Sequence, residues 1–312
     1  MSGPLRVVFM GSPEFAGPSL RGLAGSGRQV VMTVTQPDRP QGRGRKTAPP
    51  YIKTLAGELG LPVWQPDSIR GPEVLERFRE LAPDILVVVA YGRLLPPGLL
   101  GLTRLGPLNV HPSLLPAYRG PAPINWAVIN GETETGVTTM LLDRGLDTGP
   151  TLLSVKVLIE PDETAGRLHD RLAVIGADLL LETIEKLQAG TATAVPQPEA
   201  GIKPAPLLKK ADGRIDWNRP AEQLACQVRG LDPWPGSFTA FRGTFLKLFG
   251  AVPGPGRGRP GTILALDSER LHVAAGTGSL AVGELQLAGR KKTSAREFWH
   301  GQRISPGDVL GD

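Results

Sequence analysis

Cysteine is almost absent from this 312-residue chain, in which Cys226 is the only one. One cysteine cannot form an intrachain disulfide, so the composition favours a reducing compartment, and we expect a cytoplasmic location. Cys226 lies in the apolar spacing of AEQLACQVRGL, which indicates a buried helix residue rather than a nucleophile. The four histidines are scattered, with no Cys/His spacing typical of a metal site, and we expect no metal.

Long apolar runs are also missing, since none reaches the ~20 residues of a membrane span. The short run near the N-terminus leads straight into a glycine turn, and we interpret residues 5–10 as a first strand, with Ser12 capping the helix after it. The glycine fingerprints G-x-G-x-x-G and G-x-x-x-x-G-K-[ST] do not occur there, which disfavours a dinucleotide or P-loop site. The net charge of +5 is compatible with an anionic partner such as RNA, although many basic proteins bind none.

The stretch from Leu108 to Pro150 contains three polar side chains in a pattern that suggests a site. The apolar run PDILVVVAY before it is typical of a buried parallel strand. Asn109 and His111 would lie on the next strand, where a spacing of two puts both on one face. Asp147 follows in a loop between two glycines. Carboxyl ends of strands are where open α/β sheets bind ligands.

These three side chains suit acyl transfer to an amine. An amide N–H can stabilise an oxyanion, an imidazole can move a proton near neutral pH, and a carboxylate can orient that imidazole. The alternative is structural, because a histidine before a proline at a strand end is often only a buried, hydrogen-bonded side chain. The residues alone leave both interpretations open.

Several motifs resemble those of the 10-formyltetrahydrofolate-dependent formyltransferases. They are NVHPSLLPAYRGPAP from Asn109, DRGLDTG from Asp143, MGSPEFA from Met10, QPDRPQGRGRK from Gln36 and IDW from Ile215. The last three narrow the match to members that act on tRNA. The resemblance implies a formyl donor, 10-formyltetrahydrofolate, and an acceptor, the α-amino group of methionyl initiator tRNA. It also implies catalysis by Asn109, His111 and Asp147, and a tetrahydrofolate-binding segment made of Ser113, Leu114, Leu115 and Pro116.

Other functions stay open at this point. A relative with the same chemistry would formylate a small amine, such as a nucleotide sugar or glycinamide ribonucleotide, and a hydrolytic relative would pass formyl to water. An RNA-binding protein with an inactive transferase fold is a rival of another class. The intact set of three polar residues argues against that rival.

Residues 36–50 form a basic segment that we predict to be a loop, because proline and glycine are too frequent for a regular element. Four cations fall within eight residues: Arg39, Arg43, Arg45 and Lys46. The segment is either a solvated surface loop or an arm for a phosphate backbone. The resemblance implies an arm that enters the acceptor end of tRNA, with Arg43 as its main contact.

The domain prediction follows from a composition break. Residues 1–190 are expected to form an α/β catalytic domain with a Rossmann-like, mostly parallel sheet, 191–207 an extended linker, and 208–312 a second domain. Short strands between glycine turns after residue 236 predict a small β-barrel, and the resemblance implies an OB-like domain that binds tRNA. Its basic cluster contains Arg290, Lys291 and Lys292. We expect a monomer without a membrane segment.

Overall fold

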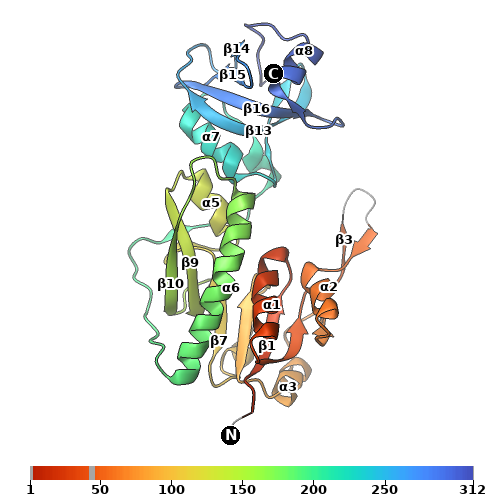
Figure 1. The fold of residues 1–312 in the computed structure, drawn as a ribbon, viewed down its shortest axis with the longest axis vertical. Coiled ribbons are helices and arrows are strands. Elements are labelled where there is room, and N and C mark those ends of the chain that lie inside the picture. Colours follow the sequence, from red (N-terminus) through yellow and green to blue (C-terminus); the bar gives the residue numbers. More distant parts are fainter. Residues whose placement is uncertain (1–2, 42–45, 312) are drawn as a thin grey trace. The chain divides into compact units, whose positions relative to one another are not determined.

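The computed structural model describes residues 3–41 and 46–311, which divide into two compact units (Figure 1). The first unit contains Met1–Pro121, Thr135–Val157 and His169–Ala205, and the second contains Ala122–Glu134, Leu158–Leu168 and Pro206–Asp312. Residues 191–205, which we predicted to be a linker, belong to the first unit. The domain limits at 190 and 207 stay a prediction.

The first unit is built on a seven-stranded sheet with the order β10-β9-β7-β6-β1-β2-β5. β1 pairs in parallel with β2 and β6, β2 with β5, and β6 with β7, whereas β9 is antiparallel to β7. The predicted mostly parallel α/β sheet is therefore confirmed. The strands are β1 (Arg6–Gly11), β2 (Gln29–Val34), β5 (Val63–Trp64), β6 (Ile85–Val89), β7 (Pro107–His111), β9 (Glu134–Leu141) and β10 (Thr151–Leu158).

Helices cover this sheet, which explains why β6 is buried along its whole length. They are α1 (Gly17–Gly25), α2 (Tyr51–Glu58), α3 (Pro72–Glu80), α4 (Pro97–Leu100) and the long α6 (Ala165–Ala189), whose first turn belongs to the second unit. Phe78 of α3 packs with Val8 and Val88 in one core cluster. α6 approaches β7 closely at Gly176, where a Cβ atom would lie 3.0 Å from Val110 Cγ1.

The predicted helix cap at Ser12 is wrong. A short 3-10 helix (Glu14–Ala16) begins after Pro13, which has an extended backbone and makes no side-chain cap. The Ser12 hydroxyl instead accepts the backbone N–H of Gln36 at 3.1 Å, with Thr35 Oγ1 3.2 Å away. Ser12 thus ties the end of β1 to the chain that leaves β2.

The prediction of a wholly irregular loop over residues 36–50 is also wrong, because β3 (Arg39–Gln41) and β4 (Lys46–Ala48) pair as an antiparallel hairpin. An isolated two-stranded ribbon is a place where Pro40 is tolerated, since no second neighbour needs its missing N–H. The base of the hairpin is fixed by Asp38, which accepts Lys53 Nζ at 2.7 Å and Gln65 Nε2 at 2.7 Å. Residues 42–45 between the two strands lie outside the described part.

The second unit has a six-stranded sheet with the main order β12-β13-β16-β15-β14, and β17 pairs with β16. Its strands pair antiparallel, and the short strands predicted after residue 236 are confirmed. Closure into an OB-like barrel stays a prediction. The elements are β12 (Ser237–Phe241), β13 (Thr244–Gly254), β14 (Ile263–Leu266), β15 (Leu271–Ala274), β16 (Ser279–Leu287), β17 (Thr293–Ser294), α5 (Pro123–Ile129), α7 (Ala221–Gly230) and α8 (Ala295–Gly301).

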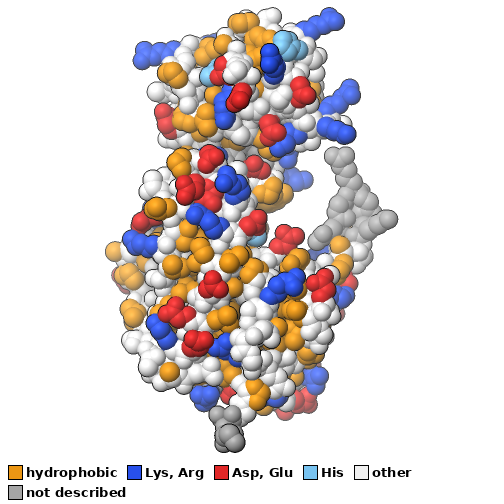
Figure 2. Space-filling view, in the orientation of Figure 1, with side chains coloured by type: hydrophobic (Ala, Val, Ile, Leu, Met, Phe, Trp, Pro, Cys, Tyr) orange, Lys and Arg blue, Asp and Glu red, His pale blue; other side chains and the backbone are white. Residues whose placement is uncertain are grey.

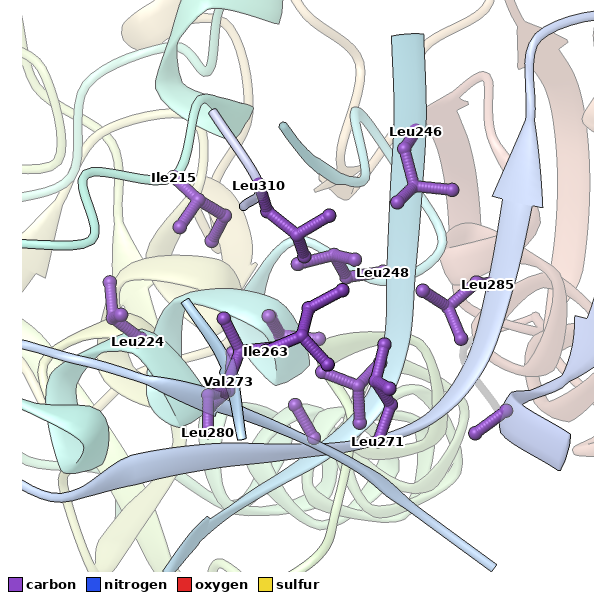
Figure 3. Packing of buried hydrophobic residues seen from close by; sticks show 14 of the residues in the cluster. Ile215, Leu224, Leu246, Leu248, Ile263, Leu271, Val273, Leu280, Leu285 and Leu310 are labelled. Atoms are coloured by element: carbon purple, nitrogen blue, oxygen red, sulfur yellow. The ribbon is translucent and has the colours of Figure 1, made fainter. Parts of the chain in front are cut away.

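Charged side chains of both signs are interspersed over the face seen in Figure 2. Beneath the surface of the second unit, side chains from the sheet, α7 and the chain before it make one apolar cluster (Figure 3). Ile215 and Trp217 of the IDW motif are 5% and 6% exposed in this cluster, and the Trp217 indole N–H donates to Thr239 Oγ1 at 3.1 Å. The motif therefore has a packing role here.

Candidate active site

Asn109 lies at the middle of β7 and His111 is its last residue, so both are on the predicted strand. Their side chains point to the same face of the sheet, and the two residues are only 8% and 5% exposed. No side-chain hydrogen bond of Asn109 is found within residues 3–41 and 46–311. Its amide is therefore available to a ligand.

The tautomer of His111 follows from its backbone partner. Nε2 lies 2.9 Å from the carbonyl oxygen of Tyr118, which can only accept, so Nε2 carries a proton. The other ring nitrogen, Nδ1, lies 3.8 Å from Asp147 Oδ2. Nδ1 is thus the atom that can gain or lose a proton, and it faces a carboxylate.

Asp147 sits in a tightly braced loop. Its Oδ2 accepts the backbone N–H of Gly120 at 2.9 Å. Its backbone φ is +55°, which costs a residue with a side chain roughly 1–2 kcal/mol. Asp143 accepts the Gly145 N–H at 2.9 Å and the Thr148 hydroxyl at 2.7 Å. The loop is therefore held in a conformation it would not adopt alone.

Sequence reasoning missed two contributors to this site. The first is the backbone carbonyl of Tyr118, a residue with a φ of +60°, and a sequence motif made of side chains cannot predict a backbone contact. Gln197 lies fifty residues after Asp147 and donates to its carbonyl at 2.9 Å. The only sequence signal for Gln197 is a polar residue between two prolines. The Arg119 side chain donates from Nε and Nη2 to Gln197 Oε1.

The segment predicted to bind tetrahydrofolate follows directly after His111 and is folded by its own hydrogen bonds. The Ser113 hydroxyl donates to the Ala117 carbonyl at 2.6 Å, and the Thr138 hydroxyl donates to the Ser113 carbonyl at 2.7 Å. Leu114, Leu115 and Pro116 remain half-buried. The assignment of this segment to folate stays a prediction.

The predicted tRNA contacts that the structure describes lie in two places. Arg39 is exposed on β3 and donates to Gln36 Oε1 at 3.2 Å. Arg290 and Lys291 are exposed between β16 and β17, while Lys292 Nζ lies 2.8 Å from Glu284 Oε2 and 4.9 Å from the Phe249 ring centre. Arg43, Arg45 and the side chain of Lys46 lie outside what the structure describes.

Two kinds of feature are absent from the described part of the chain. No three His, Cys, Asp or Glu side chains there gather as metal ligands. No helix of residues 3–41 and 46–311 combines the length and the apolar character that crossing a membrane requires.

Comparisons with known proteins cover both units. The family model "Formyl transferase" matches residues 5–184, and "Formyl transferase, C-terminal domain" matches residues 207–303. Methionyl-tRNA formyltransferase of Geobacter metallireducens is 50% identical over 98% of this chain and 99% of its own length. The same enzyme of Pelobacter propionicus is 51% identical over 98% and 96%.

Among solved structures, the N-formyltransferase from Helicobacter canadensis, in complex with folinic acid and dTDP-3-aminofucose, has a similar fold. Its TM-score is 0.69 at 18% identity, and the match covers 91% of this chain and 99% of that one. An identity this low establishes the shared fold alone.

Proposed function

The chain belongs to the formyl transferase family, and on that premise we propose that it transfers a formyl group from 10-formyltetrahydrofolate to the α-amino group of methionyl initiator tRNA. The choice of methionyl initiator tRNA as the acceptor rests on one observation. The chain is about 50% identical to methionyl-tRNA formyltransferases along nearly the whole of both chains. A small-amine acceptor, as in the Helicobacter canadensis complex, is supported only by 18% identity.

The geometry supports a direct transfer without a covalent enzyme intermediate. The methionine nitrogen attacks the formyl carbon, and the carbonyl electron pair moves to its oxygen. The free amide of Asn109 donates an N–H to this oxyanion. The attacking nitrogen becomes positively charged and releases a proton to the Asp147–His111 pair, where Nδ1 is the open position.

Collapse of the tetrahedral intermediate completes the reaction. The oxygen returns its electron pair to carbon, and the bond from carbon to the tetrahydrofolate nitrogen breaks. That nitrogen takes the proton held by His111, so one proton leaves the amine and one enters the leaving group. Asp147 lies close enough to stabilise His111 while the imidazole is charged.

The basic residues provide the tRNA part of the proposal. The cations that would contact the phosphate backbone are, in the segment 36–50, Arg39, Arg43, Arg45 and Lys46 and, in the second unit, Arg290, Lys291 and Lys292. Asn109, His111 and Asp147 come from one chain, so a second copy is not needed to complete the site. We propose a monomer in the cytoplasm, and sedimentation equilibrium tests the monomer.

The decisive experiment offers 10-formyltetrahydrofolate with charged initiator tRNA, charged elongator tRNA and free small amines in parallel. We expect formylation of the initiator species only. Transfer only to a small amine would overturn the tRNA assignment and keep the chemistry. If nothing is formylated by a folded protein, the family chemistry does not operate in this chain.

A further inference from the structure

Gln197 stands apart from its surroundings. From Thr193 to Pro204 all residues are exposed except Gln197, which is half-buried. The chain around it makes an isolated bridge from Val195 to Thr151, and β11 (Lys203–Pro204) pairs with β8 (Ala117–Arg119). The exposed segment thus runs along the first unit and inserts one side chain.

The amide of Gln197 uses its full hydrogen-bonding capacity. Nε2 donates to the carbonyls of Asp147 at 2.9 Å and Gly149 at 2.7 Å. Oε1 accepts from Arg119 Nε at 2.9 Å and Nη2 at 2.7 Å. A flipped amide would face its N–H groups toward a cation and its oxygen toward two carbonyls, so one orientation is fixed.

The amide of Gln197 joins the two segments that position the Asp147 carboxylate, through the Asp147 carbonyl on one side and the Arg119 side chain on the other. Asp147 itself has a left-handed φ of +55°, and its own carbonyl is the group that Gln197 binds. Arg119 directly precedes Gly120, whose N–H donates to Asp147 Oδ2. The same oxygen lies 3.8 Å from His111 Nδ1.

We propose that Gln197 is a positioning residue for formyl transfer, which holds the Asp147 loop against the Arg119–Gly120 segment so that the Asp147 carboxylate faces His111. This inference rests on the proposed function for its activity readout. Gln197 touches neither the reacting atoms nor His111, and it acts through Asp147. Asp147 would otherwise leave its left-handed conformation and turn its carboxylate away from the imidazole.

Two substitutions separate the donors of Gln197 from its acceptor. Gln197→Ala removes all four hydrogen bonds. Gln197→Glu keeps the acceptor for Arg119 but places a carboxylate oxygen against two carbonyls. Both variants should lower kcat by about 10- to 100-fold with little change in KM for either substrate. The exposed neighbour Glu199→Ala is the matched control and should behave as wild type.

A double-mutant cycle with Asp147→Asn distinguishes positioning from general support. If Gln197 acts through Asp147, adding Gln197→Ala to Asp147→Asn should lower the single-turnover rate by less than about twofold further. Multiplicative losses would overturn the proposal, as would wild-type kcat in Gln197→Ala or in Gln197→Glu.

Hydrogen–deuterium exchange gives a readout that does not need activity. In Gln197→Ala, peptides covering residues 141–150 should exchange faster, while those covering β1 and β6 should not change. Unchanged exchange over 141–150 would also overturn the proposal. If the wild type formylates nothing, this measurement still decides whether Gln197 holds the loop, so the two failures can be told apart.

Discussion

At the end of β7 the first unit buries Asn109 and His111, whereas the second unit exposes Arg290 and Lys291 above an apolar core. The difference follows from two tasks. A transfer step needs donors held to within a fraction of an ångström and shielded from water. Contact with a polyanion needs positive charge, and charge acts over a distance without a fixed geometry. The buried polar groups of β7 should therefore affect turnover, and the exposed cations between β16 and β17 should affect affinity.

The largest expected effect is on kcat, from a change at the buried residues of β7. His111→Ala should lower kcat by about 10²- to 10⁴-fold, because it removes the group that moves the proton, while tRNA affinity stays the same. The change also removes the hydrogen bond between His111 Nε2 and the Tyr118 carbonyl, at a cost of about 0.5–1.5 kcal/mol in the free energy of unfolding. Single-turnover rates and thermal melts measure the two effects. A His111→Ala enzyme with near wild-type kcat would contradict the proposed chemistry.

A smaller effect, on tRNA affinity, is expected from changes at the exposed cations of the second unit. Replacing Arg290 and Lys291 with Ala should weaken tRNA binding and reduce the slope of log affinity against log salt by about 1 per lost phosphate contact, with kcat unchanged at saturation. Lys292→Ala should change the slope less, since its ammonium is already paired with Glu284. Arg257→Ala, an exposed cation of the same unit, controls for net charge. Equal slopes in the wild type and the double variant would exclude this cluster from the interface.

The smallest effect concerns a pair in the second unit, far along the chain from β7. The His272 side chain, followed by the backbone N–H groups of Glu269 and Arg270, lowers the pKa of Asp267 from 3.8 to about 2. Because the folded-state pKa is lowered, the stabilisation is complete above pH 3.8 and disappears as pH falls through about 2. His272→Ala should raise this pKa but leave it below 3.8, because the backbone donors remain. An NMR titration of the Asp267 carboxyl carbon checks this, and formyl transfer should not change.

The order of elements was predictable because hydrophobic period and turn residues are local signals. β7, with Asn109 and His111 on one face, followed from a spacing of two after a buried strand. The hairpin of β3 and β4 was not predictable, because the many prolines and glycines of that segment indicate a loop. Its base is stabilised by Lys53 and Gln65, which are distant in sequence and hydrogen-bond Asp38. Ser12 failed as a cap for a similar reason, since a distant N–H competed for its hydroxyl.

The site was predictable only as far as side-chain identity goes. Asn109, His111 and Asp147 could be named, whereas the atoms that fix them could not. Tyr118 acts through its carbonyl, and Gln197 acts from a segment whose composition indicates only an extended chain. The Tyr118 contact depends on backbone dihedral angles, and the Gln197 contact depends on a distant segment folding back onto the Asp147 loop. No pattern of residue types in the sequence predicts either of them.

The close approach of α6 to β7 at Gly176 limits which mutations the family chemistry can tolerate. Replacing a glycine with alanine in a helix interior usually stabilises the helix by up to about 1 kcal/mol, and helix propensity alone would therefore favour alanine at position 176. Here a methyl group would press on Val110, which stands between Asn109 and His111 in the sequence. We therefore expect Gly176→Ala to disturb the packing of the strand that carries Asn109 and His111, so that the usual gain in helix stability is offset.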